Sequence, residues 1–307
     1  LLNKMRCVIH VNHPAHVHLF KNLIYLLKKN GSEVIVIASK KNLTFELLEL
    51  FGIKYIDIGS YGNTIREKLI NVPIIDLRTL NIIKKYSPDI FIGMGSIVNS
   101  HVSSLLNKPC VNFTDTEHSV EQLILYYFFT NYIVTPNSFK KYLGQKHVRY
   151  NGYQELAYLH PNWFTPDKNI LNKINMTVDD KIIVIRLVKW NSTHDIKHHG
   201  IENKFALIDE LKDHANIIIT SEEKDKRLEK FSYNLSPTDL HHLLYFSSLY
   251  IGDGGTTASE AAILGTHSIH ISTKAKYVGN FTELNSYDLL YTFEDQSDAI
   301  TLAKKLL

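Results

Sequence analysis

The clearest strand–helix–strand pattern in the chain is at residues 248–272, SLYIGDGGTTASEAAILGTHSIHIS. The apolar run at 248–252 is typical of a buried strand, and a glycine loop follows it. The alanine-rich residues at 257–264 then suit a helix, and residues 268–272, with isoleucine at 269 and 271, suit the next strand. A strand, a helix and another strand in succession form the unit of a parallel sheet. This stretch therefore predicts an α/β fold.

The same alternation extends outward over most of the 307 residues. We expect further strands at 6–12, 33–39, 54–58, 89–92, 109–113, 132–135, 181–187 and 215–220. We expect helices at 17–30, 43–50, 96–106, 120–129, 201–213 and 237–246, one ending near residue 86 and one from 297 onward. Turn-forming residues interrupt the pattern between 151 and 180. We therefore predict two doubly wound, Rossmann-like lobes, residues 1–155 and 156–307, with ligands in the cleft between them.

Composition and charge exclude several classes of protein. Hydrophobic residues make up 44% of the chain and charged residues 21%, which is typical of a globular protein. The net charge of +3 does not indicate a nucleic-acid partner. The apolar run at 123–129 is too short to span a membrane and fits either a buried helix face or a peripheral membrane patch. We expect no signal peptide and a cytoplasmic location, and any membrane contact would be with the inner face of the membrane. We expect the cysteines at 7 and 110 to be reduced.

The glycine loop of the opening stretch has the composition of a phosphate site. Gly254 and Gly255 let the backbone approach a ligand, and the following helix start offers N–H groups to an anion. Thr256 and Thr257 add hydroxyl donors, and Glu260 comes about one turn later, where a carboxylate can accept from ribose hydroxyls. The alternative is a tight turn whose acid suits the helix dipole. The loop matches neither a Walker A motif nor the GxGxxG pattern of dinucleotide sites.

Histidines follow the first expected strand, in NHPAHVH at residues 12–18. His16 stands at the start of a helix, where the dipole would hold it neutral and available as a general base. The alternative is a surface histidine that helps to cap the helix. His10, His13, His16 and His18 can also be read as a zinc cluster, but their spacing is not standard for that metal.

Three other loops carry polar residues after a strand. Asp115, Glu117 and His118 suit sugar hydroxyls or general-base chemistry, and the alternative for them is capping of the next helix. A divalent metal ion bound by Asp115 and Glu117 would have no other cluster of acidic residues in the sequence to complete its ligands. Gly95 and Ser96 indicate a backbone that passes close to a ligand or a helix. The loop RLVKWNSTHD at 186–195 can clamp phosphate or be an ordinary polar loop.

Together these loops resemble the GT-B glycosyltransferase superfamily over essentially the whole chain. The motifs NHPAHVH (12–18), FTDTEH (113–118), YNGYQELAYLHP (150–161) and WNSTHD (190–195) are similar to those of an uncharacterised prokaryotic family, domain of unknown function family 354. That family is related to the UDP-GlcNAc 2-epimerases and to the N-acetylglucosaminyltransferase of peptidoglycan synthesis.

The resemblance implies roles for individual residues. Glu260 matches the acid that binds the uridine ribose in both relatives, and residues 254–256 match the diphosphate loop. His16 matches a histidine in the first loop of the peptidoglycan transferase. Ser96 stands where the epimerases place an acid, which weighs against epimerisation.

We therefore expect a GT-B enzyme that transfers a sugar from a nucleotide-diphosphate donor, with UDP as the nucleotide, to a glycan or lipid-linked acceptor in cell-envelope polysaccharide synthesis. We expect neither a metal nor another cofactor. The expected catalytic residues are His16, Asp115, Glu117 and His118. The expected nucleotide-binding residues are Arg186, Lys189, Ser192, Gly254, Gly255, Thr256, Thr257 and Glu260, and those at the acceptor are His13, Gly95 and Ser96. The alternatives are a UDP-sugar 2-epimerase, a nucleotide-sugar hydrolase, and a sugar-nucleotide-binding protein without turnover.

Overall fold

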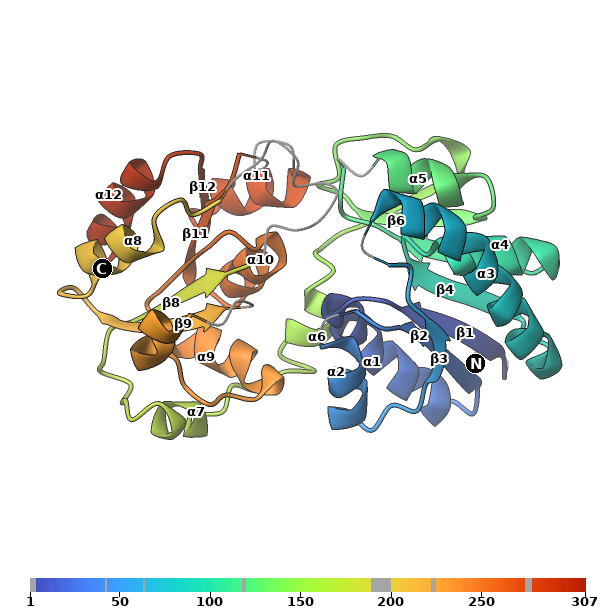
Figure 1. The fold of residues 1–307 in the computed structure, drawn as a ribbon, viewed down its shortest axis with the longest axis horizontal. Helices are drawn as coiled ribbons and strands as arrows, with labels where there is room; N and C mark the ends of the chain where they lie inside the picture. The colour runs from blue at the N-terminus through green and yellow to red at the C-terminus, as the bar shows by residue number, and fades with distance from the viewer. Residues whose placement is uncertain are drawn as a thin grey trace. The chain divides into compact units, whose positions relative to one another are not determined.

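The computed structural model describes residues 4–41, 43–62, 64–117, 120–188, 200–221, 225–273 and 278–307. It divides into two compact units, Leu1–Tyr158 and Leu159–Leu307. Each unit is built on one parallel sheet with helices on both faces (Figure 1). The predicted α/β fold with two Rossmann-like lobes is therefore confirmed.

The first unit contains seven parallel strands in the order β3-β2-β1-β4-β5-β6-β7. Their bounds are β1 (Arg6–Val11), β2 (Glu33–Ser39), β3 (Ile56–Gly59), β4 (Ile90–Met94), β5 (Cys110–Phe113), β6 (Tyr132–Pro136) and β7 (His147–Tyr150). The chain builds outward from β1 to β3 and then crosses back to β4, so β1 has β2 on one side and β4 on the other. The reversal of strand order creates a topological switch point between β1 and β4.

Helices cover both faces of this sheet. One face carries α1 (Pro14–Lys29) and α2 (Thr44–Leu50), whose apolar residues pack against β1 and β2. The other carries α3 (Ile65–Ile83), α4 (Ile97–Leu105) and α5 (Val120–Tyr127), with α4 in contact with both neighbours (Figure 1). The short helix α6 (Leu156–Leu159) follows at the end of the unit.

The second unit contains five parallel strands in the order β12-β11-β10-β8-β9. They are β8 (Ile182–Leu187), β9 (Asn216–Ser221), β10 (Leu249–Gly252), β11 (His267–Ile271) and β12 (Leu290–Phe293). Helices α8 (Lys204–Leu211) and α12 (Gln296–Leu306) pack into one apolar cluster with β8 and β9. Helices α9 (Leu240–Phe246), α10 (Gly255–Ile263) and α11 (Gly279–Ser286) contact one another in sequence, α10 in the middle. Here the switch point lies between β8 and β10.

The structure corrects several expected boundaries. Strand β7, helix α11 and strand β12 were not expected from the sequence, and the interrupted stretch 151–180 contains α6 and α7 (Asn169–Lys173). Helix α1 begins three residues before the expected start, and α10 begins two residues before it. Among the residues that the structure describes, none of the helices has the length and apolar character that a membrane crossing needs.

Candidate functional site

The first candidate site lies where β8 and β10 run side by side in the second unit. Arg186 on β8 is paired with Gly252, the last residue of β10. Just beyond the strands, the N–H of Val188 donates to Oδ1 of Asp253 at 2.9 Å. Doubly wound sheets bind ligands beyond the carboxyl ends of their strands at such a switch point. The loop at Gly254 is therefore in the position where this kind of sheet holds a ligand.

Glycine lets this loop pass close to the neighbouring strand. A Cβ on Gly252 would collide with the hydroxyl oxygen of Tyr250 and lie 3.0 Å from the carbonyl oxygen of Arg186. A Cβ on Gly254 would lie 3.0 Å from Cγ1 of Val188 and 3.9 Å from Nε of Arg186. The guanidinium of Arg186 is therefore beside the loop, where it can meet an anion.

Helix α10 begins directly after this loop, with Gly254 as its N-cap residue. Gly254 has an extended backbone, and no side chain among the described residues caps the helix. Thr256 in the first turn is exposed, whereas Thr257 is buried. Because the first N–H groups of a helix have no partner within the helix, this N-terminus can receive an anionic ligand.

Tyr250 lies buried beneath the loop and donates to the carbonyl oxygen of Gly254 at 3.4 Å. Burial raises the pKa of the Tyr250 hydroxyl far above its ordinary value, although the nearby Arg186 acts in the opposite direction. The tyrosine is therefore a neutral donor. The positive potential at the loop comes from the helix N-terminus and from Arg186.

Glu260 lies in the second turn of α10, with only 4% of its surface exposed. Its Oε1 is 3.0 Å from Nε2 of the buried His241 on α9. This contact fixes the direction of the carboxylate. Sequence reasoning missed His241, because the pair joins two helices over 19 residues of chain. That Glu260 binds a ribose stays a prediction.

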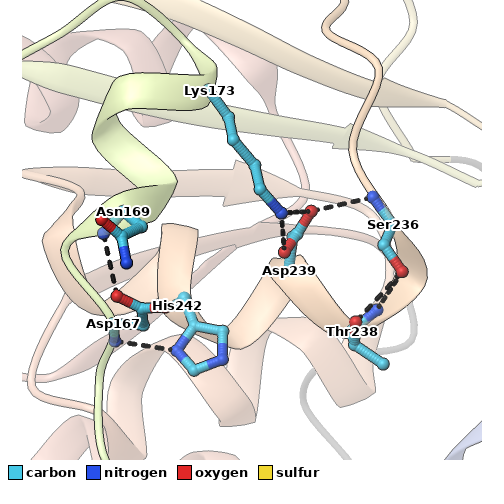
Figure 2. A network of polar contacts seen from close by, with 7 residues as sticks. All are labelled: Asp167, Asn169, Lys173, Ser236, Thr238, Asp239 and His242. Atoms are coloured by element: carbon cyan, nitrogen blue, oxygen red, sulfur yellow. Dashed lines mark hydrogen bonds and ion pairs between the residues drawn. The ribbon is translucent and has the colours of Figure 1, made fainter.

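Figure 2 shows the polar network that holds α9 in place. Lys173, at the end of α7, donates to both carboxylate oxygens of Asp239 at 2.8 Å. The N–H of Asp167 donates to Nδ1 of His242 at 3.0 Å. Because His242 follows His241 directly, these bonds also position the histidine that contacts Glu260.

His270 on β11 is a second residue that sequence reasoning did not single out. Its Nε2 is 3.3 Å from the carbonyl oxygen of Asp253, and its ring packs edge-on against Phe281 at 4.9 Å. Burial lowers its pKa to about 4, so the imidazole is neutral at neutral pH. Among the described residues its Nδ1 has no hydrogen-bond partner. His270 therefore presents a neutral, buried imidazole behind the loop.

The second candidate site follows β1 in the first unit. His13 is the N-cap of α1, and its Nδ1 accepts from the N–H of Ala15 at 3.2 Å. His13 therefore caps α1. His16 lies in the first turn of the helix, with its ring 5.8 Å from that of His13. Burial first, and then the neighbouring His13 and His10, hold the pKa of His16 well below its ordinary value. His16 is neutral, as expected, but desolvation and not the helix dipole is the main cause.

Across the switch point, β1 and α4 are joined by buried polar contacts. Nδ1 of His10 is 2.7 Å from Oγ of Ser96, which also accepts from the N–H of Asn99 at 3.2 Å. Burial lowers the pKa of His10 to about 3. The carbonyl oxygen of Gly95 accepts from the side chain of Gln122 at 3.0 Å. Ser96 and Gly95 thus take part in the packing of the unit, and their contact with an acceptor stays a prediction.

The acids after β5 differ in their surroundings. Burial raises the pKa of Asp115, although the hydroxyl of Thr116 donates to it at 2.9 Å. Glu117 is buried, its Oε1 accepts from the N–H of Lys140 at 3.2 Å, and its carbonyl oxygen accepts from Nζ of Lys141 at 2.7 Å. Because Glu117 is bonded to the segment after β6, Asp115 is the better placed of the two for proton exchange with a ligand.

The structure thus gathers predicted residues within each unit. Arg186 and the α10 start meet at one switch point, and the loops after β1, β4 and β5 lie along one edge of the other sheet. His118, Lys189 and Ser192, with the WNSTHD motif, lie outside the described residues. Within the part of the chain that is described, no three His, Cys, Asp or Glu side chains are grouped so that they could hold a metal ion.

Two parallel sheets, each covered by helices on both faces, form a two-unit α/β fold that resembles the fold of GT-B glycosyltransferases and UDP-sugar epimerases. Residues 5–307 match the family model described as protein of unknown function (DUF354), and the chain belongs to that family.

Two curated relatives differ in how much they share with the chain. It is 27% identical to an uncharacterised protein of Methanocaldococcus jannaschii over 273 residues, 85% of this chain and 80% of that protein. Over 81 residues it is 33% identical to the UDP-N-acetylglucosamine--N-acetylmuramyl-(pentapeptide) pyrophosphoryl-undecaprenol N-acetylglucosamine transferase of Desulfotalea psychrophila, 24% of this chain and 22% of the transferase.

Two solved structures show the fold more completely. The UDP-GlcNAc 2-epimerase of Methanocaldococcus jannaschii, in complex with UDP-GlcNAc and UDP, has a TM-score of 0.70 at 16% identity over 99% of this chain and 93% of its own. The spinosyn forosaminyltransferase SpnP has a TM-score of 0.62 at 12% identity over 99% and 91% of the two chains. At such identities the likeness concerns the fold.

Proposed function

We propose that the protein is a metal-independent glycosyltransferase that moves a sugar from a UDP-linked donor to a glycan or lipid-linked acceptor. The observation that carries the proposal is the N-terminus of α10, which no described side chain caps and which lies beside Arg186 at the switch point. Helix N–H groups and a guanidinium together suit a diphosphate.

On the donor side, the backbone of Gly254–Thr257 and the hydroxyl of Thr256 receive the diphosphate, with help from Arg186. Lys189 and Ser192 complete this set in the proposal. Glu260, oriented by His241, holds the ribose. Support for uridine comes from two similar proteins: the epimerase whose structure contains UDP-GlcNAc and UDP, and the transferase whose name specifies a UDP-N-acetylglucosamine donor.

On the acceptor side, a base removes the proton of the attacking hydroxyl. His16 is the first choice, because its lowered pKa keeps the imidazole unprotonated, and Asp115, Glu117 and His118 are the alternatives. The acceptor oxygen then forms a bond to the anomeric carbon, and the bond from that carbon to the diphosphate oxygen breaks. The departing charge is met by the α10 N–H groups and Arg186. His13, Gly95 and Ser96 border the acceptor.

The relative from Desulfotalea psychrophila is named for transfer to a pyrophosphoryl-undecaprenol acceptor, which supports an acceptor of the same lipid-linked kind. The proposal accordingly places the protein in cell-envelope polysaccharide synthesis on the cytoplasmic side.

A UDP-sugar 2-epimerase is the second candidate, because a solved epimerase shares the fold over nearly the whole chain. The same scaffold with water as acceptor would be a nucleotide-sugar hydrolase. Ser96 here caps α4. The sequence resemblance implies an acid at this position in epimerases, and its absence weighs against epimerisation.

The test is a thermal-shift screen with UDP-, GDP-, dTDP- and CMP-sugars, followed by product analysis of each sugar that stabilises the protein. We expect stabilisation by UDP-sugars, and UDP release that depends on an added glycan or lipid-linked acceptor. Release without acceptor would identify a hydrolase, and interconversion of two UDP-sugars an epimerase. Stabilisation without conversion under any acceptor would identify a binding protein.

Chelation tests the absence of a metal from the mechanism. If N–H groups and Arg186 meet the diphosphate charge, treatment with EDTA will leave transfer nearly unchanged. Complete loss with EDTA, restored by manganese or magnesium, would contradict this and indicate a metal site at Asp115 and Glu117.

A further inference from the structure

The outer side of α3 carries apolar residues where a surface helix normally carries polar ones. Leu69, Ile70, Ile74 and Leu77 are 69%, 54%, 56% and 61% exposed. Residues three, four or seven apart share one side of a helix, so Ile70, Ile74 and Leu77 form a single stripe. Contiguous exposed apolar surface of this kind marks an interaction site.

Helix α5 and the turn after it add a second apolar group. Ile124 and Leu125 are 56% and 45% exposed, and Phe128 and Phe129 are 73% and 44% exposed. The sequence run at 123–129 was open to two interpretations, a buried helix face or a membrane patch. One side of the run is a buried helix face, because Leu123, Tyr126 and Tyr127 pack into an apolar cluster, while the four residues named above leave its other side exposed.

One histidine joins these two groups into one surface. Nδ1 of His101 on α4 is 2.6 Å from Oδ2 of Asp76, the neighbour of Leu77 on α3. Its Nε2 is 3.0 Å from the carbonyl oxygen of Leu125 on α5, and its ring lies 4.8 Å from that of Phe129. Asp76 on α3 and Leu125 on α5 are thus linked through a single imidazole. We name this surface the α3–α5 face.

Basic residues stand at the ends of the α3–α5 face. Arg66 in the first turn of α3 and Lys84 directly after its end are exposed and lie at helical spacing from Ile70 and Leu77, so they bound the stripe. At the end of α5, Nζ of Lys146 donates to the carbonyl oxygen of Tyr127 at 3.0 Å. Among the acids, Asp76 is paired with His101, while Glu67 and Glu121 lie in the first turns of α3 and α5.

We propose that the α3–α5 face docks the protein on the surface of an anionic lipid bilayer, with the apolar side chains at the level of the headgroups and Arg66, Lys84 and Lys146 facing lipid phosphates. A second copy of the chain would be a less suitable occupant, because its own basic residues would come close to these cations. The contact is peripheral. It does not depend on the proposed transferase activity.

Vesicle flotation of the 307-residue chain tests this proposal. We expect the protein to float with phosphatidylcholine vesicles that contain phosphatidylglycerol and to remain unbound with phosphatidylcholine alone. The double variant Ile70→Ser/Leu77→Ser should lower the partition coefficient by at least about tenfold, and so should Arg66→Glu/Lys84→Glu. The matched control Leu43→Ser/Val178→Ser, which removes two exposed aliphatic residues outside the face, should bind like the wild type.

Thermal melting shows whether each variant is folded. The variant Arg66→Glu/Lys84→Glu changes charge alone and leaves the apolar side chains of the face intact. Equal flotation of the wild type and both face variants would overturn the proposal, and so would no flotation of the wild type. Light scattering that shows a dimer which Ile70→Ser/Leu77→Ser converts to a monomer would also overturn it, by assigning the face to a second copy.

Discussion

Four of the described histidines show two contrasting electrostatic situations. For the buried His10 and His270 and the half-buried His16, desolvation is the largest influence, and it lowers the pKa of all three. His101 has acceptor oxygens opposite both ring nitrogens, the carboxylate of Asp76 and the carbonyl of Leu125. A neutral imidazole can donate only one hydrogen bond, so this geometry favours the imidazolium.

The charge on His101 should make its contribution to stability depend on pH. The hydrogen bond to Asp76 raises the pKa of His101 more than burial lowers it. A raised pKa in the folded state gives stabilisation that is complete below the unfolded value of about 6.5 and is lost as pH rises through the folded value. Because His101 is partly exposed, we expect an effect on the order of 1 kcal/mol.

The measurement is the difference in melting temperature between the wild type and His101→Gln as a function of pH. The difference in melting temperature should be larger at acidic than at alkaline pH. Both proteins contain the buried histidines, so the contribution of those residues cancels in this difference. Asp76→Asn is the control and should show the same trend. A difference that is constant, or that grows with pH, would mean that His101 is neutral in the fold.

At the scale of elements, the start of α10 differs from that of α12 in the same unit. Asp295 caps α12 by accepting from the N–H of Asp298, whereas the N-cap of α10 is Gly254 without a side chain. Serine, threonine, aspartate and asparagine are the favoured N-cap residues. A helix that begins without such a cap at a switch point keeps its N–H groups available for a ligand.

Gly254→Asp should separate stability from binding. Its backbone is extended, so a side chain is sterically allowed there, and the carboxylate can cap α10 for a gain of a few tenths of a kcal/mol. The new Cβ lies 3.0 Å from Cγ1 of Val188, which must shift slightly. The melting temperature should therefore change little, while UDP affinity falls at least about tenfold, because the cap occupies the N–H groups and repels the diphosphate.

Asp295→Ala is the matched control for this variant. It removes a cap from α12 and should lower the melting temperature, by about 1 kcal/mol of unfolding free energy, without changing UDP affinity. Unchanged UDP affinity in Gly254→Asp would show that the diphosphate does not lie at the start of α10.

The buried strands could be predicted from the sequence because their apolar runs are continuous. Strand β2 was predicted to the residue, and β1, β8 and β10 to within one. Strands β7 and β12 were missed because each is a four-residue edge strand, and β7 has little buried surface. The start of α10 was placed two residues too late, since Gly255 and Thr256 are weak helix formers.

The candidate site was predictable where its residues adjoin in the sequence. The loop at Gly254 and the histidines after β1 could be found because each group is contiguous. His241 could not be found, because its contact with Glu260 depends on the packing of α9 against α10. Likewise His270 takes its low pKa from burial in β11, which no local pattern reveals.

At the scale of the whole molecule, each unit carries one candidate site at its own switch point. The second unit offers the uncapped helix, Arg186 and Glu260, which suit a nucleotide diphosphate. The first offers neutral His16 and partly buried Asp115, which suit proton transfer. Variants in the two units should therefore affect different steps, nucleotide binding in one and turnover in the other.

Calorimetric titration of UDP into the wild type, Glu260→Gln and His16→Ala tests this division most directly. Glu260→Gln keeps the shape of the side chain and removes the charge, and a hydrogen bond to a charged group contributes about 1.5–3 kcal/mol. UDP affinity should therefore fall about tenfold to a hundredfold in that variant and remain at the wild-type value in His16→Ala. Equal loss of affinity in both variants would make His16 a phosphate ligand, and wild-type affinity in Glu260→Gln would contradict a uridine site on the second unit.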